Sequence, residues 1–591
     1  MNIVSQIKPL VVKAVKELYD FSMEEKDLPV NITKPEFEGD YTVVLFSLIK
    51  QLKKIPEQLG KELGEHLVSQ HALFCGYNVI KGFLNLNITD EYWLNFLQTN
   101  FLATNFGKQP ANGTRVIVEY SSPNTNKPLH LGHLRNIFLG WSTAEILKTV
   151  GYDVVKTCVV NDRGIHICKS MIAWRDFSNG ETPASAKKKG DHFVGDYYVK
   201  FSEEHKKQTD ELIAKGLSKE EAEKQAPVMQ ATQKMLIEWE EGKPEVMDLW
   251  KKMNAWVYEG FEITYKRIGA DFDKIYYESD TYLLGKKFVE EGLRKGVFYK
   301  KEDGSIWVNL RNEGLDEKLV LRKDGTSVYI TQDLGLADEK YTDFAYDKSI
   351  YVIADEQNYH MKVLKLILDK LEKPYAKGIY HLSYGMVELP SGRMKSREGT
   401  VVDADDLLDE MAKEAEKKTR EQGKTEGFTD ADLKDLFEMI GTGGLKFYLL
   451  RVDPKKRIIF NPEESVDLHG FTATHIQYTH ARIKSILRKE KADPTFKIDK
   501  AGLLPTEKEL IMLLEQFPVT LIQAAEEYNP SVLAIYTYEL AKLFNSFYNG
   551  HSVLNAESTE KKQLRLQLSE MTANIICSAM HMLGIRVPER M

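Results

Sequence analysis

Apolar positions in the middle of the chain alternate between short runs and longer helical repeats. Two short runs rich in β-branched residues are typical of buried strands, at 115–122 and at 153–160. Helical spacing follows each run, and the first of these helices ends at Gly151. An order of strand, helix, strand, helix predicts an α/β domain with a doubly wound parallel sheet. Further strands are expected at 305–310, 327–331 and 349–354.

The remainder of the chain has different patterns. Helical spacing combines with an alternating strand pattern at 82–89, which predicts a small α/β domain at the N-terminus. Residues 178–268 are highly charged and show no strand pattern, so we expect a solvated helical insertion in the sheet domain. From residue 426 onwards the spacing is helical, which predicts an all-α C-terminal domain. The expected domain limits are 1–108, 109–400, 401–465 and 466–591.

Composition narrows the class of protein. The length of 591 residues supports several domains, and no apolar run reaches the roughly 20 residues that span a bilayer. The four cysteines form no CxxC pair, which argues against a zinc knuckle or a disulfide framework and favours a reducing cytoplasm. The net charge of −8 argues against indiscriminate nucleic-acid binding, but a specific RNA partner could use local basic patches.

The first candidate motif is His130-Leu131-Gly132-His133, which lies where a helix begins after a buried strand. Helix N-termini carry free N–H groups and a partial positive charge, so they attract phosphates. Gly132 would let a nucleotide approach the backbone, and the two imidazoles could donate hydrogen bonds to phosphate oxygens in a transition state. A chance HxGH match and a zinc pair are the alternatives, although the sequence offers no obvious third zinc ligand nearby.

The second candidate motif is a glycine-bounded basic loop, Gly392-Arg393-Met394-Lys395-Ser396-Arg397-Glu398-Gly399. Such a loop can close over ATP phosphates and neutralise developing charge. A solvated basic turn is the alternative explanation. The two motifs are much more specific as a pair than either is alone.

This pair of motifs resembles class I aminoacyl-tRNA synthetases, whose signatures are usually written HIGH and KMSKS. Within that class, five segments resemble the arginyl-tRNA synthetases, and a GDYT segment at 39–42 suggests the N-terminal domain of that family. The resemblance implies a Rossmann-like catalytic domain followed by a helical anticodon-binding domain. The five segments are SSPNTNKPLHLGHLR from Ser121, RKDGTSVYITQDLGLA at 322–337, YVIADEQNYH at 351–360, GFTATHIQYTHARIKSIL at 470–487 and the terminal GIRVPERM.

The resemblance implies that the enzyme uses ATP to join L-arginine to tRNA(Arg) through an arginyl-adenylate. A guanidinium is planar and permanently charged, so its site needs carboxylates with hydroxyl or amide acceptors. Glu119 and Asp333 would be the carboxylates, and capping of a strand or helix end is the alternative role for both. The implied arginine-binding set is Glu119, Ser122, Asn124, Tyr329, Asp333 and Gln357.

The resemblance also implies an ATP site, in which backbone groups of residues 385–387 read the adenine edge. A simple strand end is the alternative reading of that segment. Mg²⁺ would shield the phosphates, and no residue set predicts a metal held by the protein itself. The implied ATP-binding residues are His130, Gly132, His133, Gly385, Met386, Val387, Met394, Lys395 and Ser396, and the implied catalytic residues are His130, His133, Lys127, Lys395 and Arg397.

The basic loop departs from the family pattern, because Ser396 stands where KMSKS has its second lysine. Arginyl enzymes without that lysine commonly have a lysine three residues before the HxGH motif, which is Lys127 here. Lys127 is therefore expected to supply the charge that activates ATP. In the alternative, Lys127 is a solvated loop residue and Lys395 carries that charge.

In the C-terminal domain, Tyr478, Arg482 and Lys484 are expected to contact tRNA, because basic and aromatic side chains together suit unstacked bases. A solvated helix face is the alternative. A pantothenate-synthetase-like ligase needs no anticodon reader, and intact HxGH histidines argue against a non-catalytic RNA-binding paralogue. Cysteinyl and leucyl enzymes are disfavoured because zinc-spaced cysteines and a long editing insertion are absent. We expect a cytoplasmic monomer that does not bind membranes.

Overall fold

The centre of the protein is a five-stranded parallel sheet with the order β12-β11-β5-β6-β7. The computed structural model describes residues 2–390, 402–421, 423 and 427–591. Chain order reverses between β5 and β11, so the crevice at their carboxyl ends is where such a sheet binds ligands. The strands are β5 (Arg115–Glu119), β6 (Asp153–Val160), β7 (Lys274–Tyr277), β11 (Lys348–Ala354) and β12 (Ile379–Tyr384).

The predicted fold class is confirmed, with two corrections to the strands. The strand expected at 305–310 forms β9 (Ile306–Val308), but it lies in a separate antiparallel sheet, β10-β9-β8. The prediction of a strand at 327–331 is wrong, because the helix α14 (Tyr329–Phe344) begins there. Its apolar residues at a spacing of three and four, Ile330, Leu334 and Ala337, are buried together, which favours a helix over a short alternating run. The other two strands of the antiparallel sheet are β8 (Phe298–Lys300) and β10 (Lys318–Leu321).

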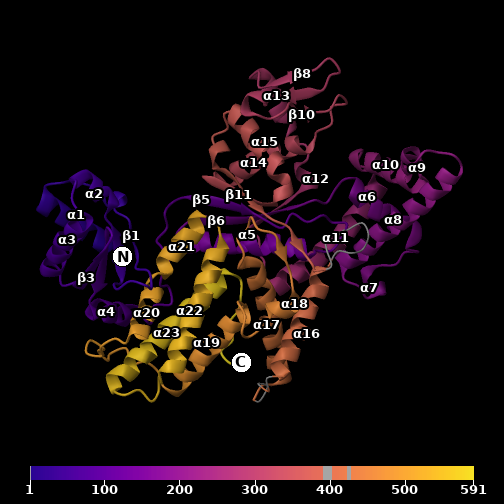
Figure 1. Ribbon diagram of the computed structural model, residues 1–591. Helices are drawn as coiled ribbons and strands as arrows, with labels where there is room; N and C mark the ends of the chain where they lie inside the picture. Colours follow the sequence, from indigo (N-terminus) through magenta and orange to yellow (C-terminus); the bar gives the residue numbers. More distant parts are fainter. Residues whose placement is uncertain (1, 391–401, 422, 424–426) are drawn as a thin grey trace.

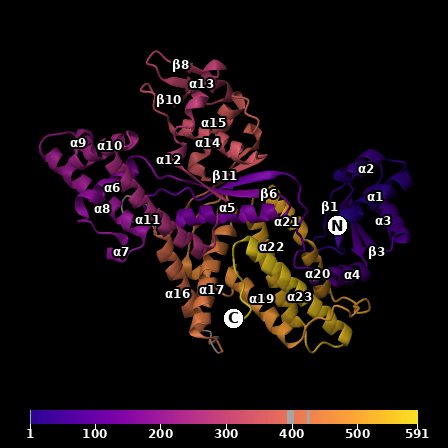
Figure 2. The ribbon, with the colours of Figure 1, turned by 180° about the vertical axis from the view of Figure 1, so that it is seen from behind.

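Helix α5 (Leu131–Thr149) lies between the parallel sheet and the C-terminal helices (Figures 1 and 2). It contacts β5, β6 and β11 on one side and α17, α21 and α22 on the other, so most of its side chains are buried. Its N-terminus therefore has a fixed position beneath the ligand-binding edge of the sheet. The other helices beside the sheets are α6 (Ile165–Phe177), α12 (Glu278–Thr281), α13 (Lys286–Arg294) and α15 (Asn358–Lys370), with the short turns η2 (Arg311–Glu313), η3 (Asp355–Gln357) and η4 (Ala376–Gly378).

The charged segment between β6 and β7 is helical, as predicted. Its helix α8 packs against α6 and α11, and the group projects from one end of the molecule (Figure 1). Its helices are α7 (Pro183–Ala186), α8 (Gly190–Ala214), α9 (Lys219–Gln225), α10 (Pro227–Glu240) and α11 (Pro244–Ile268).

The N-terminal region contains an antiparallel sheet of order β1-β2-β4-β3. It docks on the C-terminal helices, where the Ile3 N–H donates to Glu515 Oε1 at 2.6 Å and Lys508 Nζ lies 2.7 Å from Asp40 Oδ2. Its elements are α1 (Ile3–Tyr19), η1 (Glu25–Asp27), β1 (Val30–Ile32), β2 (Tyr41–Val44), α2 (Phe46–Leu52), α3 (Pro56–Gln70), β3 (Phe74–Ile80), β4 (Phe83–Ile88) and α4 (Asp90–Asn100).

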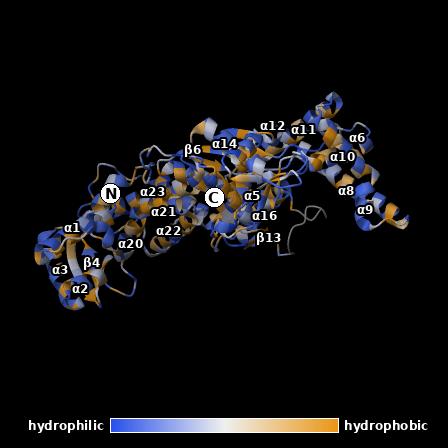
Figure 3. Ribbon diagram, turned by 90° about the horizontal axis from the view of Figure 1, so that it is seen from above, coloured by the Kyte–Doolittle hydropathy of each residue, from blue (hydrophilic) through white to orange (hydrophobic). Residues whose placement is uncertain are grey.

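Among the residues that the structure describes from 387 onwards, the chain is helical apart from one small parallel ladder, β13 (Val387–Glu388) with β14 (Ile458–Ile459). Seen from above, the N-terminal helices and α8–α9 lie at opposite ends of an elongated molecule, and most helices show both hydrophilic and hydrophobic residues (Figure 3). Within the described residues, every helix is too short or too polar to cross a bilayer. The helices are α16 (Ala404–Glu421), α17 (Asp430–Leu450), α18 (Pro462–Ser465), α19 (Ala473–Lys489), α20 (Pro505–Glu515), α21 (Phe517–Glu526), α22 (Pro530–Gly550) and α23 (Thr559–Met582).

Candidate active site

The loop between β5 and α5 begins with two residues in an unusual backbone conformation. Ser121 and Ser122 both adopt positive φ angles, 82° and 45°, which are unfavourable for residues with a Cβ. Asn136 of α5 fixes this conformation, because its Oδ1 accepts from the Ser121 N–H at 2.6 Å and its Nδ2 donates to the Val352 carbonyl at 2.7 Å. One side chain thus joins the loop, α5 and β11 at the point where the strand order reverses.

The two histidines of the HxGH motif cap the N-terminus of α5. His130 Nδ1 accepts from the Gly132 N–H and His133 Nδ1 accepts from the His130 N–H, each at 3.1 Å. Their ring centroids are 3.8 Å apart. Burial, with the nearby Lys127 charge, lowers the pKa of His130 to about 3, and burial also holds the pKa of His133 well below its usual value. Both rings are therefore neutral and carry their proton on Nε2, so each has one N–H to donate.

Lys127 lies in the same loop, close to both histidines. Burial lowers the pKa of Lys127, and its charge lowers the pKa values of His130 and His133. The structure therefore places a half-buried lysine beside the HxGH motif, at the positive end of α5.

Residues that follow the basic loop also meet this turn. The Leu131 N–H donates to the Val402 carbonyl at 3.2 Å, and the Ala404 N–H donates to the Leu129 carbonyl at 3.0 Å. His130 and Asp403 form an isolated antiparallel bridge between these two bonds. The candidate residues Met394, Lys395, Ser396 and Arg397 themselves lie outside the described residues.

The segment 385–387 contacts α5 through Arg135. The Arg135 guanidinium donates to the Gly385 carbonyl, and it also donates to the Lys456 carbonyl at 2.7 Å. The Gly385 N–H donates to Pro454, and the Met386 carbonyl accepts from Ile458. In the ladder with β14, the Met386 and Glu388 carbonyls face Ile458 and Phe460, so the N–H and C=O of Val387 point away from β14.

Several of the predicted arginine-binding residues lie at the carboxyl edge of the sheet. Asp333 on α14 is 2.5 Å from His360 Nε2, and its side chain is 40% exposed. Tyr329 at the start of the same helix is 77% exposed, and Gln357 ends the exposed turn η3 after β11. Asn124 is exposed and bridges to Asn161 at the end of β6. These side chains are accessible to a ligand placed above the strands.

Glu119 has a different environment. Its carboxylate is buried at the end of β5 and pairs with Lys340 of α14, which is fully buried. The Lys340 ammonium also lies 4.2 Å from the centroid of the Tyr351 ring. A protein side chain already neutralises Glu119, which sequence reasoning did not anticipate.

Sequence reasoning missed Glu278, which directly follows β7. Burial raises the pKa of Glu278 to about 7. The Arg163 charge opposes this rise, whereas the charges of Asp162 and Asp333 add to it. Asp162 is satisfied by Ser279, which donates its N–H at 2.9 Å and its hydroxyl at 2.8 Å. Glu278 thus lies in the electrostatic neighbourhood of Asp333 at the same edge of the sheet. An acidic residue at the end of a strand could have identified Glu278, but the strand β7 itself was not predicted from the sequence.

The predicted tRNA-binding residues lie on α19. The Arg482 guanidinium is sandwiched between Tyr478 and Tyr548, at 4.8 and 5.1 Å from the ring centroids, and it donates to Asn545. Lys484 forms a loose ion pair with Glu589, at 3.7 Å. The expected mixture of basic and aromatic groups is present, although the Arg482 guanidinium already contacts Tyr478, Tyr548 and Asn545 within the protein.

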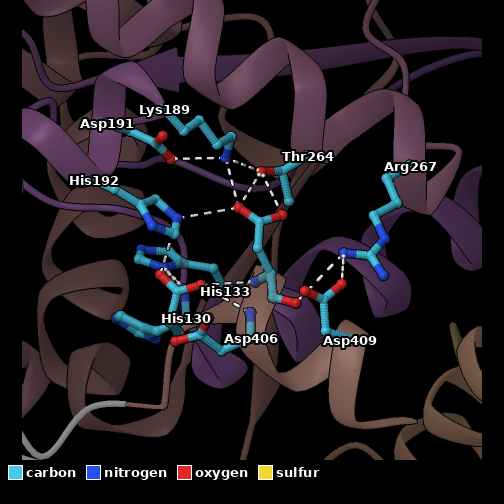
Figure 4. Close-up of polar contacts among 11 residues, drawn as sticks. His130, His133, Lys189, Asp191, His192, Thr264, Arg267, Asp406 and Asp409 are labelled. Atoms are coloured by element: carbon cyan, nitrogen blue, oxygen red, sulfur yellow. Dashed lines mark hydrogen bonds and ion pairs between the residues drawn. The ribbon is translucent and has the colours of Figure 1, made fainter. Parts of the chain in front are cut away.

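A group with metal-ligand spacing lies beside the HxGH turn, formed by Asp191, His192 and Asp405 (Figure 4). The Lys189 ammonium is 2.6 Å from Asp405 Oδ2 and 3.0 Å from Asp191 Oδ2. An ammonium already supplies the positive charge that a cation would bring, so this group does not suit a divalent metal ion.

Comparison with known proteins agrees with this geometry. Residues 97–461 match the family model of the class I tRNA synthetase (R) catalytic domain. The parallel sheet with an HxGH turn at its switch point is that of a class I aminoacyl-tRNA synthetase. Residues 5–88 match the arginyl-tRNA synthetase N-terminal domain, and residues 476–591 match the DALR anticodon-binding domain. The chain belongs to the arginyl-tRNA synthetase family, as the sequence motifs indicated.

Individual relatives cover the whole chain. The arginine–tRNA ligases of Amoebophilus asiaticus and Bacteroides thetaiotaomicron are each 50% identical to it, over 100% of both chains. The solved structure of Thermus thermophilus arginyl-tRNA synthetase matches with a TM-score of 0.79 at 24% identity, covering 100% of both chains. That of Plasmodium falciparum matches with a TM-score of 0.76 at 18% identity, covering 100% of this chain and 99% of the other. The fold is shared throughout.

Proposed function

We propose that this enzyme attaches L-arginine to tRNA(Arg) in two steps, using ATP. The arginine carboxylate attacks the α-phosphate of ATP to give arginyl-adenylate and pyrophosphate. A terminal ribose hydroxyl of the tRNA, on the 2′ side, then takes the arginyl group and releases AMP. The observation that supports this most is the HxGH turn, where two neutral imidazoles cap the N-terminus of α5 and lie near Lys127.

The phosphate chemistry is assigned to residues at the start of α5. His130 and His133 use Nδ1 to cap the helix, so their Nε2–H groups are available to phosphate oxygens. Neutral donors bind those oxygens more strongly as negative charge grows during attack. Lys127 adds a full positive charge in a partly buried position, where Coulomb interactions are stronger than in water. The basic-loop residues Met394, Lys395, Ser396 and Arg397 complete the proposed ATP site.

The guanidinium of the substrate is assigned to Asp333 and Glu278. Burial makes the ionisation of Glu278 unfavourable despite the charge of Arg163, and a bound guanidinium would relieve that cost. Glu119 serves the site through its pairing with Lys340, which fixes the junction of β5 and α14. Ser122, Asn124 and Gln357 are proposed to bind the α-amino and carboxylate groups, and Tyr329 would cover the side chain.

Adenine recognition is assigned mainly to Val387. Its N–H and C=O point away from β14 and form the donor–acceptor pair that an adenine edge requires. Gly385, Met386 and Gly132 shape the surrounding backbone. A Cβ at Gly385 would come within 2.8 Å of the Lys456 backbone, so glycine permits this close approach.

Magnesium is proposed to arrive with ATP as part of the substrate. The described acidic group nearest to metal-ligand geometry already contains the Lys189 ammonium, so it does not fit the ion. Mg²⁺ is commonly bound through substrate phosphates and water molecules.

The tRNA is proposed to contact the N-terminal and C-terminal domains, which dock on each other. The four-part division at 1–108, 109–400, 401–465 and 466–591 assigns the tRNA body to the first part and the anticodon to the last. Tyr478, Arg482 and Lys484 would face the anticodon loop. We further propose a cytoplasmic monomer; its four free thiols suit a reducing compartment, and light scattering would measure its mass.

One assay tests the activity directly. Purified enzyme is incubated with ATP, Mg²⁺, total tRNA and one labelled amino acid at a time. Arginine alone should become acid-precipitable with the tRNA, and the product should be lost when ATP is omitted. Charging of another amino acid at a comparable rate, or of none, would contradict the proposal.

A further inference from the structure

Four charged residues join the helical insertion to the segment that pairs with the HxGH turn. Lys189 and His192 lie at the start of α8, whereas Asp403 and Asp405 lie at the start of α16, more than two hundred residues later in the chain. His192 Nε2 is 3.3 Å from Asp403 Oδ2 and 3.2 Å from Asp405 Oδ2. We name these four residues the insertion clamp; Figure 4 labels its two basic members, Lys189 and His192.

The clamp is tightly built around Asp405. The Lys189 ammonium is 2.6 Å from Asp405 Oδ2, and the hydroxyl of Thr264 on α11 is 3.2 Å from each Asp405 oxygen. The next turn is held as well, since Arg267 Nη1 is 2.7 Å from Asp409 Oδ1. Although burial alone would raise it, the hydrogen bonds from His192 and Lys189 lower the pKa of Asp405 to about 2. Asp405 is therefore charged and held by both basic residues.

Asp403 links the clamp to the candidate active site. Its Oδ1 caps α16 by accepting from the Asp405 N–H at 2.8 Å, and its backbone bridges to His130. The flanking bonds run from Leu131 to Val402 and from Ala404 to Leu129. Any displacement of residues 402–405 therefore moves one wall of the HxGH turn, including the backbone that orients the His130 ring.

We propose that Lys189 and His192 are positioning residues for adenylate formation, holding residues 402–405 so that His130 keeps its place. The helical insertion then has a role beyond a solvated addition to the fold. This inference rests on the proposed catalytic role of His130. Misplacement of a catalytic group by as little as 1 Å can cost up to about 100-fold in rate, so weakening the clamp should lower kcat.

Asp405→Asn is the most informative variant. It removes the charge that both basic residues bind, yet it leaves Lys189 paired with the buried Asp191, so no buried acid loses its cation. Asp406→Asn is the matched control, because it makes the same change one residue later at an exposed position. ATP–pyrophosphate exchange and aminoacylation should be measured per competent site, counted from the burst of adenylate formation.

The clamp hypothesis expects Asp405→Asn to lower kcat of both reactions about tenfold, with the KM for tRNA unchanged. Asp406→Asn should match wild type. A merely structural role would lower the thermal midpoint and the number of competent sites while leaving kcat per site unchanged. That result, or equal kcat for the two asparagine variants, would overturn the proposal.

His192→Gln gives a second, independent readout. The hydrogen bond to Asp405 raises the pKa of His192, and the charges of Asp403 and Asp191 raise it further. Burial and the Lys189 charge act in the opposite direction and lower this pKa. Of the groups on α11, Thr264 and Arg267 contact Asp405 rather than the ring. The ratio of the wild-type kcat to the His192→Gln kcat should be largest below that raised pKa. The ratio should shrink as pH rises through that pKa, because the imidazolium loses its charge.

His205→Gln is the control, because this half-buried histidine of α8 bonds the Glu223 carbonyl instead of a carboxylate, and it should show no such trend. If the ratio of the wild-type kcat to the His192→Gln kcat did not change with pH, a charged role of His192 would be contradicted. His130→Ala, assayed in parallel, separates the two levels of the argument. Full activity in that variant refutes the proposed phosphate site, whereas an inactive His130→Ala with wild-type kcat in Asp405→Asn refutes only the clamp.

Discussion

The exchange of Glu278 for glutamine tests the proposed arginine pocket most directly. The change keeps the shape of the side chain and removes its charge. Loss of one partner from a desolvated charge pair costs about 2–5 kcal/mol, and each 1.4 kcal/mol is a factor of ten in affinity. Because Glu278 is only half-buried, the lower part of that range applies. The KM for arginine in ATP–pyrophosphate exchange should therefore rise about 30- to 100-fold, with a small change in the KM for ATP.

The pH dependence provides a second check on Glu278. Its pKa of about 7 in the free protein means that arginine binding must compete with a proton. In wild type, kcat/KM for arginine should fall as pH drops below about 7, and Glu278→Gln should lack this inflection.

The stability of the arginine-free protein should depend on pH in the opposite way: it should fall as pH rises, whereas kcat/KM for arginine should increase. A folded pKa above the unfolded value of 4.5 means that the folded state holds more protons, so its stability falls as pH rises through that interval. Glu278→Gln removes this penalty and should raise the thermal midpoint at pH 8. Glu119→Gln is the contrast: it strands the buried Lys340 and should lower the midpoint strongly. Near-wild-type arginine dependence in Glu278→Gln would refute the assignment of this carboxylate.

Three further predictions concern residues identified from the sequence. Asp333→Asn should raise the KM for arginine about 100-fold while leaving ATP binding nearly unchanged; wild-type charging at low arginine would contradict the pocket. Lys127→Ala should lower kcat of pyrophosphate exchange at least about 100-fold, and adding Ser396→Lys should recover part of the rate; a near-wild-type Lys127→Ala would assign the activating charge elsewhere. Replacing Arg482 and Lys484 together by alanine should weaken tRNA use and reduce its salt dependence relative to wild type, with arginine and ATP constants unchanged; a tRNA KM equal to wild type at every salt concentration would exclude their contact with RNA.

The sequence predicted the sheet core because its strands are short, apolar and bounded by helices. It failed at 327–331, where the β-branched run SVYIT forms the start of α14, since five residues cannot distinguish the two spacings. It also missed β7, whose tyrosines and lysine lack an apolar run, and with it Glu278.

The candidate site was predictable where chemistry follows a local motif. The HxGH turn and Lys127 are contiguous, and the structure brings them together. The pairing of Glu119 with Lys340 and the insertion clamp join residues more than two hundred positions apart. No local pattern encodes such pairs, because each charge alone resembles a solvated surface residue.

The docking of the first helix on the C-terminal helices has a consequence for biosynthesis. The Ile3 N–H and the Glu515 carboxylate that accepts its hydrogen bond are 512 residues apart. At roughly 5–20 residues per second, about 25–100 seconds pass on the ribosome between the emergence of the two partners. Throughout that time Asp40 lacks its ion pair with Lys508 and Tyr41 lacks its hydrogen bond from Gln516, because neither partner has yet been made. Closure of this contact is thus a late event of maturation, and a nascent chain released early would carry an undocked N-terminal domain.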